Sequence, residues 1–405
     1  GDLEEEIYMD LPKGMVEDYN KGKCLKLKKT IYGLVQSARQ WYYKLIDSLK
    51  AIGFAQSEVD PCLLVQNKSG STVMIATYVD DCLCVGKKDD LERLIDEITK
   101  LKFKVKVEKG ISDYLSCEVI RKEDSIWIGQ PHILKNIKKD FGQEVKKLQL
   151  YKTPGTPGQI LRRHKDLPGL NEPDHKRYRS GVGMLLYLVK HSRPDIGNAV
   201  RELTKLLDKP TPIAYKEMVR IMKYVMDTRQ LGLHMCPNPQ GEIREWSMVM
   251  FSDSEYAGDK DTRISVGGFI LYVMDVPIIW RSKAQRSVTL SSSEAEYVAM
   301  SEAVKEILFI KQLIEDMGIK VKTPIIVRMD NVGAMYIATN PSTNTRTRHI
   351  DIRYHFVREH VENGVIQIIF VRTDENTADI FTKNVKSELH EKHTKGMVKN
   401  KPSEK

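Results

Sequence analysis

The feature that most constrains the fold is a pair of β-rich runs that each end in an aspartate, with a long helix-forming segment between them. The first run is Trp246 to Asp253 and the second is Pro324 to Asp330. The intervening segment, Ser291 to Met317, carries apolar residues at helical spacing. If the runs pair as parallel strands with this helix as the crossover, Asp253 and Asp330 lie side by side, about 5 Å apart.

Further β-rich runs supply neighbours for this strand pair. Ser265 to Val273 and Ile278 to Ser282 follow the first run, and Val365 to Arg372 follows the second. Their β-branched and aromatic residues predict strands. We therefore expect a mixed β-sheet with flanking helices.

Four acidic residues lie where these strands end or where helices begin: Asp253, Glu294, Asp330 and Asp379. Hard divalent cations take oxygen ligands, and phosphodiester hydrolysis uses two such cations, one for the attacking water and one for the leaving oxygen. The joint pattern predicts a metal-dependent nuclease site at the end of the sheet.

Structural alternatives exist for two of the four acids. Ser291-x-x-Glu294 is a capping box, in which the glutamate accepts a backbone hydrogen bond at the helix start and does no chemistry. Asp379 follows the last β-rich run, where an amphipathic helix is expected to begin, and a first-turn acid there would face the helix dipole. The sequence alone leaves both alternatives open.

A second pair of carboxylates, Asp80 and Asp81, lies between the apolar runs Val73 to Val79 and Cys82 to Val85. This pattern predicts a hairpin with both carboxylates at its tip. Tight turns favour glycine, whereas Asp-Asp brings like charges together, so a bound cation would explain the pair. The alternative is an exposed acidic turn.

The charge balance favours a polyanionic partner. The 405 residues carry 64 Lys and Arg against 55 Asp and Glu, a net charge of +9. Lys21 to Lys29 and Thr99 to Lys109 place Lys at nearly alternating positions, which predicts strands with one basic face. Such a face fits a phosphate backbone, but it also fits an ordinary solvated strand face.

Other residues argue against zinc and against a membrane. The six cysteines form no CxxC pair, so a zinc site is not expected. The segment containing His349, Asp351, His355, Glu359 and His360 lacks the HExxH spacing and is better explained as a solvated helix face. No signal peptide and no membrane-spanning run is present, so we expect an intracellular protein with reduced thiols.

Proline and glycine mark a change in organisation in the middle of the chain. Tyr151 to Tyr178 holds four prolines and predicts a linker or an extended crossing segment. Three helices are expected after it, at Tyr178 to Lys190, Pro194 to Leu207 and Pro212 to Asp227. From Lys386 onward the polar, Lys-rich composition predicts a disordered tail.

Several strings resemble a known family. FSDSEYAGD, SSSEAEYVA, MDNVGAM, RHIDIRYHFVRE and TADIFTK look like the RNase H region of copia-type LTR retrotransposon Pol polyproteins. LKKTIYGLVQSARQWY, YVDD and YRSGVGMLLYLVKHSRPDI resemble the reverse transcriptase and connecting region of the same family. The resemblance covers nearly the whole chain.

The resemblance implies a multidomain protein of α/β and α+β class. Residues 1–150 would form part of a reverse transcriptase palm and thumb, 151–245 a linker and helical connection, 246–385 an RNase H-like domain, and 386–405 the disordered tail. Asp253, Glu294, Asp330 and Asp379 would be the RNase H ligands for Mg²⁺ or Mn²⁺. Asp80 and Asp81 would be the polymerase pair.

The implied partners are RNA/DNA hybrid, template RNA and DNA, in the cytoplasm within virus-like particles and in the nucleus. A third polymerase carboxylate of the family would fall just before Gly1, so we expect polymerase activity only if that part is supplied. The alternative function is a catalytically inactive nucleic-acid-binding relic or structural subunit. The oligomeric state stays open.

Overall fold

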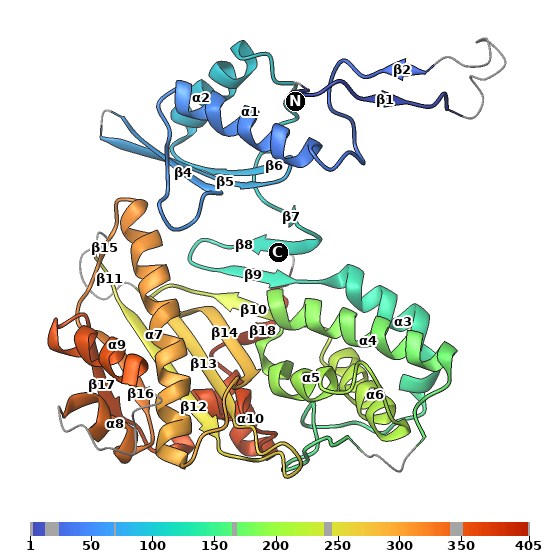
Figure 1. Cartoon of the computed structure of the whole chain (residues 1–405), viewed down its shortest axis with the longest axis vertical. Coiled ribbons are helices and arrows are strands. Elements are labelled where there is room, and N and C mark those ends of the chain that lie inside the picture. Colours follow the sequence, from blue (N-terminus) through green and yellow to red (C-terminus); the bar gives the residue numbers. More distant parts are fainter. Residues whose placement is uncertain are drawn as a thin grey trace. The chain divides into compact units, whose positions relative to one another are not determined.

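The structure is a computed structural model that describes residues 3–12, 24–68, 70–163, 168–238, 245–340 and 351–403. The chain has a mixed α/β architecture with several sheets (Figure 1). It divides into two compact units, one formed by residues 1–108 with 312–318 and the other by 109–311 with 319–405. The finer division into four segments stays a prediction, except at the C-terminal end.

The first unit is built on a four-stranded antiparallel sheet of order β3-β4-β5-β6. Two helices, α1 and α2, lie on one face of this sheet (Figure 1). Every second residue of β5 is buried, as expected for a strand with one buried face; these residues are Val73, Ile75 and Thr77. The elements are α1 (Ser37–Ala51), β3 (Ala55–Gln56), β4 (Leu63–Lys68), β5 (Ser71–Tyr78), β6 (Asp81–Val85) and α2 (Lys88–Lys100), preceded by a short ribbon of β1 (Tyr8–Met9) and β2 (Leu25–Lys26).

The second unit contains a mixed five-stranded sheet of order β14-β13-β12-β16-β17. β12 pairs with β13 and β13 with β14 in antiparallel fashion, whereas β12 with β16 and β16 with β17 are parallel. The elements are β12 (Met248–Glu255), β13 (Val266–Val273), β14 (Val276–Ala284), α7 (Ser292–Asp316), β16 (Ile325–Met329), α8 (Val332–Thr339), α9 (Asp351–Glu362) and β17 (Ile366–Phe370). The predicted strands and the crossover helix are confirmed.

A helical core accompanies this sheet in the second unit. The three predicted helices are confirmed, although the first begins earlier because the side chain of Asn171 accepts a hydrogen bond from Asp174 N, 2.8 Å. A further helix from the expected first segment packs into the same core through Ile137 and Phe141. The elements are α3 (Pro131–Lys146), α4 (Glu172–His191), η1 (Pro194–Ile196), α5 (Gly197–Thr204) and α6 (Pro212–Asp227).

The expected disordered tail is wrong. The C-terminal residues form α10 (Ser387–Thr394) and β18 (Val398–Asn400), and β18 pairs with β10 (Leu231–Met235). They complete a second five-stranded sheet with β9 (Ile126–Gly129), β8 (Cys117–Arg121) and β7 (Asp113–Tyr114). His390 and His393 are buried. The segment packs through these histidines and a few apolar side chains, so its polar composition did not indicate that it is ordered.

The predicted Lys-rich strands are also wrong over most of their length. α2 extends to Lys100, and residues 101–109 form no strand. Of the first Lys-rich segment only Leu25–Lys26 is a strand, and residues 21–23 lie outside the described part of the chain. Alternation alone does not make a strand, because a strand also needs a neighbouring edge with which to pair.

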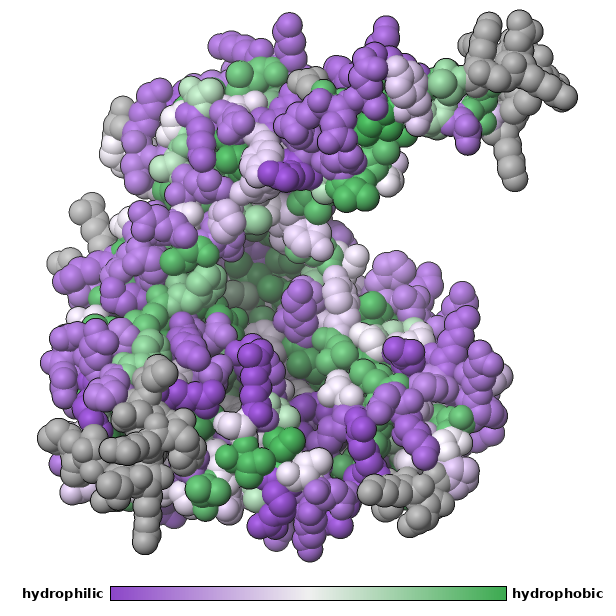
Figure 2. Space-filling view, viewed as in Figure 1, coloured by the Kyte–Doolittle hydropathy of each residue, from purple (hydrophilic) through white to green (hydrophobic). Residues whose placement is uncertain are grey.

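The surface is that of a charged protein. Hydrophilic side chains cover most of the face seen in Figure 2, with smaller hydrophobic areas among them. Within the described ranges, no helix is both long enough and apolar enough to cross a bilayer.

A buried ion pair lies in the helical core where it contacts the C-terminal segment. Arg193 Nε and Nη2 donate to the two carboxylate oxygens of Asp195, both at 2.8 Å, and both residues are almost fully buried. Tyr224 Oη donates to Asp195 at 3.2 Å, and the His390 ring bonds to the Asp195 carbonyl at 2.9 Å. α10 is therefore fixed to the helical core.

We expect Asp195→Asn to lower the free energy of unfolding by about 3–5 kcal/mol, because it leaves the Arg193 charge buried without its counterion. Asp208→Asn breaks an exposed Arg–Asp pair with Arg163 and should cost at most about 1 kcal/mol. Chemical unfolding of both variants measures the difference. Equal losses would contradict the account of this core.

Candidate metal centre

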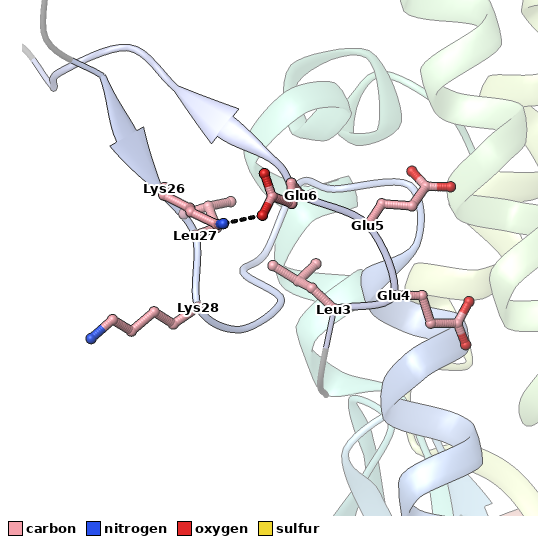
Figure 3. A pocket seen from close by; sticks show the side chains of 7 residues that line it. All are labelled: Leu3, Glu4, Glu5, Glu6, Lys26, Leu27 and Lys28. Atoms are coloured by element: carbon pink, nitrogen blue, oxygen red, sulfur yellow. Dashed lines mark hydrogen bonds and ion pairs between the residues drawn. The ribbon is translucent and has the colours of Figure 1, made fainter.

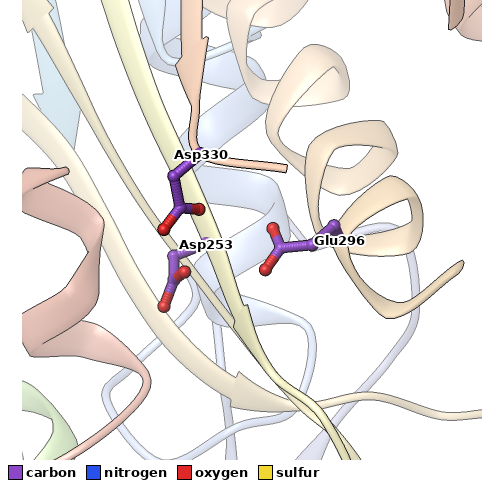
Figure 4. Close-up of side chains that lie close together, drawn as sticks. All are labelled: Asp253, Glu296 and Asp330. Carbon is purple, nitrogen blue, oxygen red and sulfur yellow. The ribbon is translucent and has the colours of Figure 1, made fainter. Parts of the chain in front are cut away.

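Three carboxylates from separate elements meet at the mixed sheet. Asp253 lies in β12, Glu296 in the first turns of α7, and Asp330 directly after β16 (Figure 4). One carboxylate oxygen from each lies within 4.8 Å of the others. In the part of the chain that the structure describes, this is the only such group of three or more His, Cys, Asp or Glu.

Strand register brings the two aspartates together. In the parallel pair of β12 and β16, Val249 lies opposite Ile326 and Phe251 opposite Arg328. The same register continued by two residues places Asp253 opposite Asp330. The expectation that these two carboxylates lie side by side is confirmed.

The glutamate in the group is Glu296 and not the predicted Glu294. Glu294 N donates to Ser291 Oγ at 3.2 Å, and Leu290 N donates to Glu294 Oε2 at 2.7 Å. Glu294 therefore makes the capping interactions that the alternative described, at the start of α7. Two residues correspond to about 200° around a helix, so Glu294 and Glu296 point in nearly opposite directions.

The sequence contains a signal that would have identified Glu296. It lies on the same helical stripe as Ala299, Ala303 and Ile307, all of which are buried. An ionisable residue on a core stripe is costly unless it is paired or bound. A charged residue at a core position of the helix was therefore a better indicator of the metal-binding glutamate than a position in the first turn.

Asp379 reaches the site from a different element than expected. It lies in a short 3₁₀ helix, η4 (Thr377–Phe381), and not at the start of an amphipathic α-helix. Its side chain is buried, and Lys383 Nζ lies 2.8 Å from its Oδ1. Asp379 is next to the group of three carboxylates but is not part of it.

A glycine allows η4 to approach the sheet. Gly268 in β13 is paired with Asp253, and a Cβ at that position would lie 2.8 Å from Phe381 Cβ and from Thr382 Cγ2. With no side chain there, Thr382 Oγ1 reaches Asp253 Oδ2 and donates a hydrogen bond. Close backbone packing thus positions η4 at the carboxylates.

Sequence reasoning also missed Asn376. This fully buried residue caps η4, since its side-chain oxygen accepts from Ala378 N. Its Nδ2 donates to Ser252 O at 3.0 Å and to Asp330 Oδ1 at 3.4 Å. Asn376 therefore connects η4 to both aspartate-bearing strands and orients Asp330.

The electrostatics of the group favour a bound cation. Burial, followed by the charge of Asp379, raises the pKa of Asp253 to about 7. Burial and the charge of Asp253 also raise the pKa of Glu296 well above its ordinary value. Ser254 N donates to Glu296 Oε1 at 3.0 Å, while Oε2 is buried with no hydrogen-bond partner among the described residues. Carboxylate oxygens that lack a positively charged partner and a full set of hydrogen bonds are suitable ligands for Mg²⁺ or Mn²⁺.

The expected hairpin at Asp80 and Asp81 is confirmed. Tyr78 pairs with Asp81, which leaves Val79 and Asp80 as the turn. Val79 has φ 57°, a conformation that β-branched residues rarely adopt. Trp41 Nε1 donates to Val79 O at 2.8 Å, and Tyr32 Oη donates to Asp80 Oδ2 at 3.2 Å. Both carboxylates are exposed, and no third described carboxylate joins them.

Two other acidic or His-containing segments do not form such a group as far as their residues are described. In the open hollow of about 420 Å³ between residues 3–6 and 26–28, Lys26 pairs with Glu6, and Glu4 and Glu5 point elsewhere (Figure 3). In α9, His355 is exposed and Val357 is buried, as expected for a solvated face, whereas His349 lies outside the described residues.

Comparison with known proteins finds a family match in the first part of the chain and relatives over nearly its whole length. A family model described as reverse transcriptase (RNA-dependent DNA polymerase) matches residues 1–151. The Retrovirus-related Pol polyprotein from transposon RE1 of Arabidopsis thaliana is 33% identical over 384 residues, which are 95% of this chain and 25% of that protein.

Two further relatives agree. The Pol polyprotein from transposon RE2 of Arabidopsis thaliana is 31% identical over 405 residues, 100% of this chain and 27% of that protein. The Pol polyprotein from transposon TNT 1-94 of Nicotiana tabacum is 32% identical over 393 residues, 95% of this chain and 29% of that protein. The chain thus spans about a quarter of the length of these relatives.

The fold and the carboxylate group define a mixed α/β protein with a site suited to divalent cations. The first 151 residues match the reverse transcriptase family model, and over 95–100% of its length the chain is similar to copia-type retrotransposon Pol polyproteins.

The raised pKa values predict how stability depends on pH. A carboxyl group whose pKa is raised in the folded chain takes up a proton on folding. Below the unfolded pKa of about 4 the group is protonated in both states, so it does not lower the free energy of unfolding. As pH rises through the folded pKa, the contribution of such groups lowers the free energy of unfolding of the metal-free protein. The free energy of unfolding of Asp253→Asn, relative to that of the unsubstituted chain, should therefore be higher at about pH 8 than at about pH 5.

Urea unfolding in the presence of a chelator measures this effect. The exposed Asp208→Asn serves as the control and should show no such pH-dependent gain. A gain for Asp253→Asn that is equal at both pH values would contradict the assignment of a raised pKa.

Proposed function

We propose that this chain hydrolyses the RNA strand of RNA/DNA hybrids in a reaction that depends on divalent cations. The single observation that carries the proposal is the meeting of Asp253, Glu296 and Asp330 at the mixed sheet. The sheet order, with two parallel pairings and a crossover helix, supports an RNase H-like fold. The resemblance of the five strings in the C-terminal half supports the same function.

The residues of the chain have separate roles in this proposal. Asp253, Glu296 and Asp330 would hold the cations, which when bound would supply an activated water and stabilise the leaving oxygen. Asn376 orients Asp330, and Ser254 N holds Glu296 Oε1 so that Oε2 is directed to ligand binding. Thr382 orients Asp253. No side-chain nucleophile is required.

The substrate class follows from charge and family. A net charge of +9 favours a polyanionic partner through counterion release. Reverse transcription by the family produces a hybrid duplex, so RNA/DNA hybrid, template RNA and DNA are the proposed partners. Mg²⁺ or Mn²⁺ is the proposed cofactor.

A second candidate activity is a part in RNA-directed DNA polymerisation. It is supported by the match of residues 1–151 and by the hairpin that presents Asp80 and Asp81 beside a left-handed Val79. Strained backbone of this kind is often found at functional sites. Because no third described carboxylate joins the pair, polymerisation would need one from outside the described residues.

Paired substitutions of the two glutamates test the nuclease proposal. With labelled RNA/DNA hybrid and Mg²⁺, Glu296→Gln should lower the cleavage rate by about 10²-fold or more, because it removes a ligand charge. Glu294→Gln should cleave at nearly the unsubstituted rate and lose at most about 1 kcal/mol of stability through the weakened cap. The RNA strand alone is the substrate control.

Loss of cleavage in Glu294→Gln with activity kept in Glu296→Gln would overturn the proposed site. Salt-sensitive hybrid binding without any cleavage by the unsubstituted chain would instead favour the alternative of a nucleic-acid-binding relic or structural subunit.

A further inference from the structure

Lys383 places a positive charge inside the acidic site. Its Nζ lies 2.8 Å from Asp379 Oδ1, and the side chain of Asp379 is almost completely buried. The Lys383 side chain is 38% exposed. Its ammonium group therefore lies between the buried carboxylate of Asp379 and the solvent side of the site.

The surroundings of Lys383 are those expected for a cation-binding position. Although burial lowers the pKa of Lys383, the charges of Asp253, Asp379 and Glu255 together raise it above its ordinary value. The ammonium group is therefore attracted by Asp253 as well as by Asp379. Asp253 also belongs to the group of three carboxylates, so it is common to two adjacent acidic positions.

The first of these positions consists of Asp253, Glu296 and Asp330 and contains no ammonium or guanidinium partner among the described ion pairs. The second consists of Asp253 and Asp379 and contains Lys383. One position is thus open to a divalent cation, while a protein cation neutralises the other.

We propose that Lys383 is a positioning residue that occupies the second cation position, so that the substrate-free chain binds one divalent cation at Asp253, Glu296 and Asp330 while Asp379 stays paired with Lys383. This inference rests on the proposed function and adds a substrate-dependent step to it. A second divalent cation must displace Lys383 from Asp379.

The geometry gives the displaced ammonium group a destination. Lys383 follows η4 by two residues, and its backbone N donates to Asp379 O at 3.2 Å, so its main chain stays fixed while the long side chain turns. A phosphate of the substrate offers the ammonium group a new anionic partner. Substrate binding would then free Asp379 for the second cation.

Mn²⁺ binding to the full chain without nucleic acid tests this proposal, with bound ions counted from the loss of the free Mn²⁺ signal in electron paramagnetic resonance. The unsubstituted chain should bind one ion that Asp253→Asn abolishes. Lys383→Met should bind two such ions, with the affinity for the second raised about tenfold or more, because a unit positive charge beside Asp379 is gone. Lys383→Arg keeps the charge and should bind one.

Controls separate this effect from others. Lys392→Met removes an exposed Lys–Asp partner on the same terminal segment and should leave the count at one. The double variant of Asp253→Asn with Lys383→Met should lose the gained ion. If Lys383→Met does not fold, Lys383→Gln provides the same neutral charge with a donor for Asp379.

Two Asp253-dependent ions in the unsubstituted chain, or an unchanged count in the neutral Lys383 variants, would overturn the inference while leaving the proposed function standing. No Asp253-dependent ion in any chain would overturn the proposed function and this inference together.

Discussion

The parallel pairing of β12 with β16 is the constraint on which the site depends. One register places two aspartates at adjacent positions on neighbouring strands, and α7, as the crossover between them, brings Glu296 to the same place. Burial deprives these carboxylates of hydration, and the charges of neighbouring carboxylates repel them, which explains the raised pKa values of Asp253 and Glu296. Such a site lowers the stability of the protein when no cation is bound, and bound cations would offset the repulsion.

The surrounding structure limits that cost by hydrogen bonds and one ion pair. Asn376, Thr382 and Ser254 N each donate to a different carboxylate of the group, and Lys383 neutralises Asp379. Three of these residues come from the segment around η4, which approaches the sheet because Gly268 has no side chain. α10 and β18 follow directly and are fixed to the helical core through His390 and Asp195. The C-terminal segment is thus part of what supports the site.

Periodicity and strand ends were enough to predict the mixed sheet, the crossover helix, the Asp253 and Asp330 pair and the hairpin at Asp80. They failed where tertiary contacts decide. Position in the first turn favoured Glu294, whereas the glutamate of the metal group, Glu296, is the one that shares a helical stripe with buried residues further along α7. η4, α10 and β18 are short, and their stability comes from packing that their polar composition does not reveal.

The most direct test of the account is a crystal structure of the protein grown with Mn²⁺, with the ion located by anomalous diffraction. We expect an anomalous peak within coordination distance, about 2.0–2.2 Å, of oxygens from Asp253, Glu296 and Asp330, with Glu294 still bonded to Leu290 N. A peak coordinated by Glu294, or no peak at the three carboxylates at saturating Mn²⁺, would contradict it.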